Sequence, residues 1–188
     1  AVPEGKGAIA AIIGLTYSDL NSICLSITNE GLLVEIANIN SSNQIVISGI
    51  KEAVDIAIQR CTEAGAKRAL KLPMSVPAHC KLMKPASEKF KEVLNSINMQ
   101  EPKCKVIQNV NASATNKVET IAENLISQIY RPVRWTDIMN SLNELSLSKC
   151  FECGPGKVLS GLMKRTLKDT EIISLDNYES FTNKDNFL

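Results

Sequence analysis

The 188 residues carry a formal net charge of +1, with 44% hydrophobic and 22% charged side chains. This length can bury a core, and the composition is typical of a globular protein. A charge so close to zero gives no field that attracts nucleic acid or an acidic membrane surface, so we expect neither as a partner. Without an apolar run that could span a bilayer or a signal-peptide pattern, the sequence favours a cytoplasmic protein.

The first part of the chain shows six segments with clear periodicity. We predict strands over 7–15, 32–39, 44–49 and 67–72, and helices over 18–29 and 51–64. Their order, β-α-β-β-α-β, is the ferredoxin-like arrangement. This fold supports many unrelated functions, so the order alone says little about activity.

The remainder of the chain alternates helical and extended patterns. We predict helices over 85–97, 118–130, 135–145 and 158–167, and strands over 105–110, 150–153 and 171–175. Such alternation indicates a mostly parallel sheet covered by helices. The expected fold class is therefore α/β, with a small ferredoxin-like subdomain followed by a larger body.

His79 is the only histidine in the chain. Imidazole is the side chain whose ordinary pKa lies nearest neutrality, which makes it the usual proton carrier in catalysis. Pro73 and Pro77 precede it and stiffen the backbone, so the stretch predicts a rigid loop that orients the ring. On these residues alone, a histidine that only packs within a loop remains the alternative.

Two polar groups in the first part of the chain could bind a ligand. Asn38, Asn40 and Gln44 surround one turn, where their amides suit a neutral polar ligand but also suit turn formation. Lys67 and Arg68 could bind a phosphate, or could be a solvated start of a strand.

Residues 154–157, Gly-Pro-Gly-Lys, lie between a predicted strand and a predicted helix. Free N–H groups at such a helix start can bind an anion. The segment is not a Walker A loop, which needs GxxxxGK[ST]. A tight turn that needs glycine for steric reasons is the alternative.

The six cysteines offer no evident chemistry. Cys150 and Cys153 form a single Cys-x-x-Cys pair, and with one histidine in the chain we expect no zinc site or other metal. A redox role is disfavoured because Gly154 and Pro155 stand where a helix should begin. Cys80 adjoins His79, but neighbouring side chains of an extended segment point apart.

A histidine base needs a nucleophile. No G-x-S-x-G elbow occurs in the chain, and no cysteine stands in an obvious nucleophile context. The chain also starts at Ala1, without an initiator methionine, and runs almost at once into a strand. We therefore expect half of an active site, in a chain that is part of something longer.

Seven segments together resemble the malonyl-CoA:acyl carrier protein transacylase family, in its order and spacing. They are residues 1–3, 7–14, 38–49, 65–69, 75–83, 128–135 and 154–159. The resemblance implies a ferredoxin-like subdomain, residues 1–73, inserted into an α/β-hydrolase-like acyltransferase body whose C-terminal part is residues 74–188. It also implies that the nucleophilic serine, the oxyanion-hole amides and an arginine for the malonyl carboxylate lie upstream.

The resemblance further implies ping-pong transfer of malonyl from malonyl-CoA to the phosphopantetheine thiol of acyl carrier protein, for fatty-acid biosynthesis. His79 would be the general base and acid, and the backbone carbonyl of Gln128 would orient its ring. Malonyl-CoA is a substrate, and no cofactor is implied. The chain alone, without the serine, is expected to be inactive.

The remaining family positions concern substrate binding. By resemblance, the loop near the acyl and pantetheine arm holds Asn38, Asn40 and Gln44. The basic positions that would face coenzyme A phosphates and the carrier protein are Lys67 and Arg68. The positions that would form the pocket walls are Val76, Ala78 and Val158. Ala78 departs from the serine expected in bacterial members, which bears on malonyl selectivity. Two alternatives stay open: an acyltransferase domain of a polyketide synthase, and a non-catalytic module that binds a carrier protein.

Overall fold

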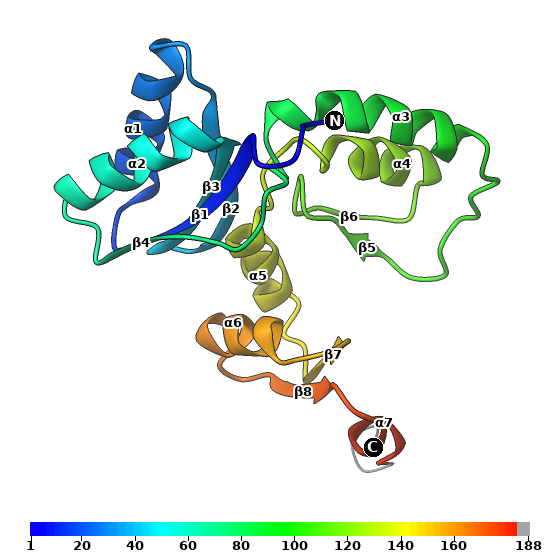
Figure 1. Cartoon of the computed structure of the whole chain (residues 1–188). Coiled ribbons are helices and arrows are strands. Elements are labelled where there is room, and N and C mark those ends of the chain that lie inside the picture. The colour runs from blue at the N-terminus through cyan, green and yellow to red at the C-terminus, as the bar shows by residue number, and fades with distance from the viewer. Residues whose placement is uncertain (184–188) are drawn as a thin grey trace. The chain divides into compact units, whose positions relative to one another are not determined.

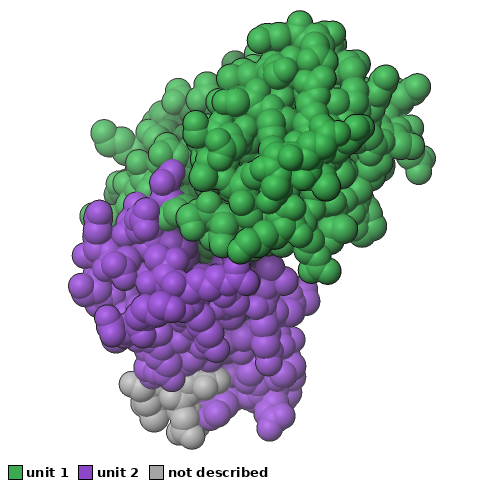
Figure 2. Space-filling view, turned by 90° about the vertical axis from the view of Figure 1, so that its left-hand side faces the viewer, with its two compact units in different colours: residues 1–136 green, residues 137–188 purple. Residues whose placement is uncertain are grey.

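The computed structural model describes residues 1–183 of the chain, which divides into two compact units, residues 1–136 and 137–188 (Figure 2). The first unit contains the expected ferredoxin-like segment, residues 1–73, together with residues 74–136. None of the helices in residues 1–183 combines the length and apolar character that a bilayer crossing requires.

The first unit is built around a four-stranded sheet with the strand order β2-β3-β1-β4, in which every neighbouring pair is antiparallel. Its elements are β1 Gly7–Ile13, α1 Tyr17–Asn29, β2 Val34–Ser41, β3 Gln44–Ile50, α2 Lys51–Glu63 and β4 Arg68–Lys71. This order is the ferredoxin-like topology expected from the sequence. α1 begins slightly earlier than predicted, because the Thr16 hydroxyl caps it by accepting the Asp19 N–H at 3.2 Å.

The two faces of this sheet are covered differently. α1 and α2 pack on one face, where alternate strand residues such as Ile12 and Ile47 form the main core with helix residues such as Leu20 and Ala57 (Figure 1). The other face carries a smaller cluster: Ile9, Ala37 and Val46, with Leu72 and Ala78 packed against it. The chain that leaves β4 therefore lies over the face opposite the two helices.

The rest of the first unit contains two helices that lie side by side in Figure 1. The elements are the 3₁₀ turn η1 Lys81–Met83, α3 Lys84–Asn95, β5 Val106–Ile107, β6 Ala114–Thr115 and α4 Val118–Ser127. The predicted strand over 105–110 is reduced to β5, which pairs antiparallel with β6. Of the apolar residues of α3, Leu94 is buried, whereas Val93 is 59% exposed.

The second unit contains a β-α-β element. Its elements are the greater part of α5 Trp135–Glu144, then β7 Lys149–Cys153, α6 Val158–Thr166, β8 Glu171–Leu175 and α7 Tyr178–Thr182. β7 and β8 pair in parallel, in line with the crossover helix between them. The prediction of one mostly parallel sheet was wrong for residues 1–183, because β5 finds its partner within its own hairpin and leaves β7 and β8 as the only parallel strand pair there.

Candidate active site

The loop that carries His79 is held close to the sheet. Ala78 packs on the apolar cluster of the face opposite α1 and α2. Pro77 is fully buried and lies against Gly7 at the start of β1, where a Cβ would come within 2.7 Å of Pro77 Cγ. Gly7 therefore permits a close approach that a larger residue would prevent.

His79 itself has a strained backbone, with φ of 63°. Few residues other than glycine, asparagine and aspartate adopt this left-handed region, and such strain persists only where surrounding contacts hold it. The His79 N–H donates to the carbonyl of Ile129 at 3.1 Å, which is one of those contacts.

The imidazole ring of His79 is oriented by a backbone carbonyl. Its Nδ1 lies 2.7 Å from the carbonyl oxygen of Gln128, the C-cap residue of α4. The last carbonyls of a helix lack partners within the helix, so this oxygen is available. A carbonyl can only accept, so Nδ1 carries the hydrogen and Nε2 keeps a free lone pair. The half-buried ring is thus in the tautomer that a general base requires.

The segment after Gln128 is anchored to the edge strand β2. The Val133 N–H donates to Ala37 O at 2.8 Å, and the Ile39 N–H donates to Val133 O at 2.9 Å. The Thr136 hydroxyl adds a bond to Ile39 O at 3.1 Å. The orienting carbonyl is therefore positioned by the sheet that also supports the His79 loop.

Two of the three predicted amide residues lie on the sheet face opposite the helices. Asn38 pairs with Val46, which belongs to the cluster on that face, whereas Asn40 lies at a register shift between Ile39 and Ser41. Gln44 precedes the core residue Ile45 and is directed to that face as well. This is the face on which the His79 loop lies.

The other predicted site residues are more scattered. Arg68 and Gln44 both pair with Ile13, so they lie at the same end of the sheet, and Lys67 immediately precedes β4. Val76, in the loop, is 52% exposed. Val158 belongs to the second unit, at the first position of α6, and is 74% exposed.

A cavity of about 400 Å³ next to His79 was not foreseen from the sequence. Lys81, Lys84 and Arg131 contribute cations to its wall, Glu35 a carboxylate, and α1 apolar side chains. The Lys84 ammonium and the Arg131 guanidinium lie 5.7 and 5.9 Å from the centre of the Tyr130 ring. Tyr130 and Arg131 were the sequence signal that could have indicated this cavity, but nothing in the neighbouring sequence indicated that they would lie close to His79.

The thiols of Cys80 and Cys24, the cysteines nearest this site, are buried. Cys80 is fully buried and its thiol donates to Pro77 O at 3.2 Å, and burial raises its pKa. Burial also raises the pKa of Cys24 to about 12. Within residues 1–183, no three histidine, cysteine or acidic side chains gather in a way that could hold a metal ion.

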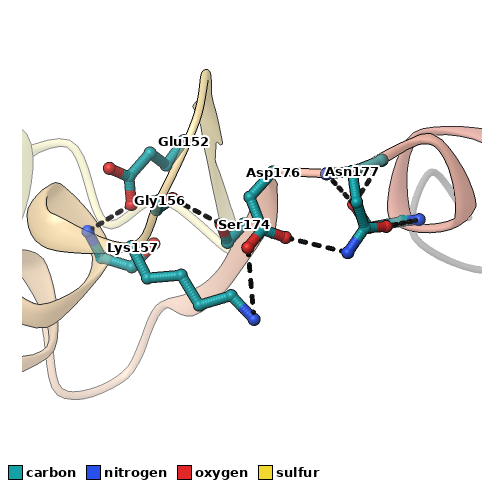
Figure 3. A network of polar contacts seen from close by, with 8 residues as sticks. Glu152, Gly156, Lys157, Ser174, Asp176 and Asn177 are labelled. Atoms are coloured by element: carbon teal, nitrogen blue, oxygen red, sulfur yellow. Dashed lines mark hydrogen bonds and ion pairs between the residues drawn. The ribbon is translucent and has the colours of Figure 1, made fainter.

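The Gly-Pro-Gly-Lys turn at 154–157 does not offer a free anion site at the start of α6. The Glu152 carboxylate accepts the N–H groups of Leu159 at 3.0 Å and Ser160 at 2.7 Å. Figure 3 shows Glu152 beside this turn. Interactions with the Ser160 side chain first, and then with the backbone N–H groups of Ser160 and Leu159, lower the pKa of Glu152. The helix start is therefore neutralised by a side chain of the preceding strand.

The rest of this turn is held by the neighbouring strand. The Ser174 hydroxyl donates to Gly156 O at 3.2 Å, and the Lys157 ammonium pairs with Asp176 at 3.5 Å (Figure 3). Cys150 and Cys153 are both free thiols in β7, where an odd spacing directs them to opposite faces. The turn and the Cys-x-x-Cys pair thus belong to the packing of the β-α-β element.

The chain thus has a mixed α/β fold in which the single imidazole is held on a backbone carbonyl. No protein-family model matches the chain. The malonyl CoA-acyl carrier protein transacylase of Haemophilus influenzae is 44% identical over all 188 residues, which cover 60% of its length. That of Bacillus subtilis is 43% identical over 96% of the chain and 57% of its own length.

Solved structures agree with this likeness. FabD from Acinetobacter baumannii matches 99% of the chain and 59% of its own length, with a TM-score of 0.92 and 41% identity. A malonyl-transacylase solved in complex with its type II polyketide synthase acyl-carrier protein matches with a TM-score of 0.90 and 41% identity, over 95% of the chain and 58% of its own length. The chain is therefore a homologue of the malonyl-CoA:acyl carrier protein transacylases, and it spans about 60% of the length of its relatives.

Proposed function

We propose that this chain is the part of a malonyl-CoA:acyl carrier protein transacylase that supplies the proton carrier, His79. The observation that carries the proposal is the 2.7 Å contact between His79 Nδ1 and the Gln128 carbonyl, in a chain homologous to these enzymes. No G-x-S-x-G segment occurs in the 188 residues, so the nucleophilic serine belongs to the portion of the relatives' length outside this chain.

The proposed reaction has two balanced halves. The serine oxygen attacks the malonyl thioester while His79 Nε2 takes its proton; the carbon–sulfur bond then breaks, and the imidazolium returns the proton to the coenzyme A thiolate. In the second half, His79 takes the proton of the carrier protein's phosphopantetheine thiol. The thiol attacks the acyl-serine, the carbon–oxygen bond breaks, and the serine regains its proton.

Gln128 acts through its backbone and not through its side-chain amide. A neutral carbonyl holds the ring as firmly as a carboxylate in geometric terms but stabilises the imidazolium less. This suits an acyl-enzyme that must form and break down readily in both directions.

Substrate contacts are proposed on the sheet face that supports the His79 loop. Asn38, Asn40 and Gln44 would hydrogen-bond the acyl and pantetheine arm, and the pairing of Asn38 with Val46 on this face supports the assignment. Lys67 and Arg68 would meet coenzyme A phosphates and the acidic carrier protein.

Three apolar residues are proposed as pocket walls: Val76, Ala78 and Val158. The exposed fractions of Val76 and Val158, 52% and 74%, leave them available for contact with substrate or with further chain. Ala78 leaves more room than a serine and lacks its hydroxyl, so we expect weaker discrimination between malonyl and slightly larger acyl groups.

In architectural terms, we propose residues 1–73 as a ferredoxin-like subdomain and residues 74–188 as the C-terminal part of an α/β-hydrolase-like acyltransferase body. The end of β4 at Lys71 supports this boundary. Acyl carrier protein is the proposed partner, since the matched malonyl-transacylase was solved with one. That carrier belongs to a type II polyketide synthase, which keeps polyketide synthesis as a second candidate pathway beside fatty-acid synthesis.

A chimera tests the proposal. In it, the 188 residues replace the matching segment of the Haemophilus influenzae relative, and malonyl transfer from labelled malonyl-CoA to acyl carrier protein is measured. We expect transfer by the chimera, none by the 188-residue chain alone, and a loss of about 10²–10⁴-fold in the chimera with His79→Ala. Glu30→Ala, which removes an exposed ion pair with Arg60, is the matched control. Undiminished transfer by the His79→Ala chimera would refute the role of His79.

A chimera that binds acyl carrier protein but forms no acyl-enzyme would favour the non-catalytic carrier-binding module instead. Trapping the labelled malonyl group on protein, before the carrier is added, separates the two outcomes.

A further inference from the structure

Glu35, on the edge strand β2, makes two contacts with one residue of the His79 loop. Its Oε2 accepts the backbone N–H of Lys81 at 2.8 Å, and its Oε1 pairs with the Lys81 ammonium at 2.6 Å. The Glu35 side chain is 24% exposed and that of Lys81 is 63% exposed.

The backbone contact matters because of where Lys81 lies. It follows His79 by two residues, and Cys80 between them is fully buried. The Cys80 thiol donates to Pro77 O, and the Met83 N–H donates to Cys80 O at 2.9 Å. The loop is therefore too tightly connected for Lys81 to move without moving His79.

The His79 loop is thus held from two sides. On one side, the Gln128 carbonyl accepts a hydrogen bond from Nδ1 of the His79 ring, and the Ile129 carbonyl accepts one from the His79 backbone N–H. On the other side, the Glu35 carboxylate holds the N–H of Lys81. A hydrogen bond to an ionised acceptor is shorter and stronger than a neutral one, and the left-handed backbone of His79, at φ of 63°, needs such support.

We propose that Glu35 is a positioning residue for His79: by holding the backbone of Lys81, it keeps the imidazole on the Gln128 carbonyl and its Nε2 free. The structural claim stands on the chain alone, and its consequence for catalysis rests on the proposed function. Glu35 does not exchange a proton with the reacting groups in this scheme.

Three variants separate the backbone contact from the ion pair. Lys81→Met removes the ammonium but keeps the N–H that Glu35 holds. Glu35→Gln keeps an acceptor oxygen of the same reach and loses the charge. Glu35→Ala removes both contacts. Glu30→Ala is the control for loss of a surface carboxylate, because Glu30 bonds Arg60 on the helix side of the sheet.

The single histidine makes the ring easy to observe. Labelling with ¹⁵N-histidine gives one imidazole, and in mildly alkaline buffer its two nitrogen shifts report which one carries the hydrogen. We expect a protonated Nδ1 and a bare Nε2 in the wild-type chain, in Lys81→Met and in Glu30→Ala. We expect a partial shift towards averaged tautomers in Glu35→Gln and full averaging in Glu35→Ala.

A Glu35→Ala ring spectrum identical to that of the wild type would overturn the proposal. So would a loss of the tautomer in Lys81→Met as large as in Glu35→Ala, because the ion pair would then be the relevant contact. If Glu35→Ala does not fold, as judged from its amide spectrum, Glu35→Gln and Lys81→Met decide the question. A larger loss of the single tautomer in Glu35→Gln than in Lys81→Met supports the proposal, and an equal or smaller loss overturns it.

Kinetics in the chimera test the catalytic consequence. We expect Glu35→Ala to lower kcat about 10–100-fold, since a small misplacement of a catalytic group has effects of this size. KM for malonyl-CoA should stay unchanged. A chimera without any malonyl transfer would count against the proposed function and leave the spectroscopic result valid, whereas a normal kcat in Glu35→Ala would count against positioning.

Discussion

Two turns of the chain look equally functional in sequence, and the structure separates them. The loop at 73–80 and the turn at 154–157 both follow a strand, both contain proline, and both carry a polar group suited to chemistry. In the first, the Gln128 carbonyl accepts a hydrogen bond from Nδ1 of His79 and leaves Nε2 free. In the second, Glu152 accepts two amides at the start of α6. A polar motif becomes a site only where the fold leaves part of its hydrogen-bonding capacity unused.

Of the substitutions that test this comparison, one at Gly7 should have the largest effect, because Gly7 lets the His79 loop pack closely against the sheet. A Cβ at this position would lie 2.7 Å from both Ser75 O and Pro77 Cγ, so Gly7→Val must displace the loop. We expect a loss of about 1–3 kcal/mol in the free energy of unfolding, measured by denaturant titration. The His79 ring should also lose its single tautomer in the ¹⁵N spectrum.

Gly161→Ala is the matched control, because a Cβ there meets no atom within 4 Å. It lies in α6, where alanine should be neutral or stabilising by up to about 1 kcal/mol. Equal destabilisation by both substitutions would show that the close approach at Gly7 is not what holds the loop.

The second largest effect is expected at the turn 154–157, where Glu152 already accepts the N–H groups at the start of α6. Glu152→Ala leaves the Leu159 and Ser160 amides without their acceptor, so the start of α6 should open more often. Amide hydrogen exchange at these two residues should become faster, and the melting temperature should fall. Glu171→Ala, which removes a longer ion pair with Lys149 at 3.7 Å, is the control and should change the exchange of α6 little.

A smaller effect is the pH dependence of the same contact. Hydrogen bonds from Ser160 and Leu159 hold the pKa of Glu152 below its ordinary value of 4.5. A carboxyl group with a lowered pKa stabilises the folded state at pH values above its unfolded pKa, and this contribution disappears as the pH falls through the folded pKa. Protection of the Leu159 and Ser160 amides should therefore decline in acid more steeply in the wild type than in Glu152→Gln. Parallel declines in the two proteins would show that Glu152 is not the responsible group.

The sequence predicted the ferredoxin-like part well because its signals are local. Apolar runs mark β1 and β3, and helical spacing of residues such as Ala53 and Ala57 marks α2. The predicted parallel sheet was wrong because strand pairing depends on neighbours distant in sequence. Residues 105–110 have the composition of a strand, but only Val106 and Ile107 find a partner, in β6.

The site shows the same division between local and distant signals. His79 could be singled out because it is the only histidine and follows two closely spaced prolines. Its partner Gln128 is 49 positions away and acts through a carbonyl that every residue possesses, so only the family resemblance pointed to it. Glu35, 46 positions before Lys81, carries no local signal either, because its role depends on how the loop crosses the edge strand.

The smallest effect is expected from removing the Gln128 side chain, because in this proposal only the backbone carbonyl of Gln128 contacts His79. If the Gln128 carbonyl orients His79, Gln128→Ala keeps that oxygen and should leave both the ring tautomer and the kcat of the chimera unchanged. Gln128→Pro is the contrasting variant. Proline removes the N–H that donates to Asn124 O at 2.9 Å, so it disturbs the end of α4 and with it the carbonyl. We expect Gln128→Pro to lose the single tautomer in the ¹⁵N spectrum. If Gln128→Ala behaves like Gln128→Pro, the amide side chain and not the backbone positions the imidazole.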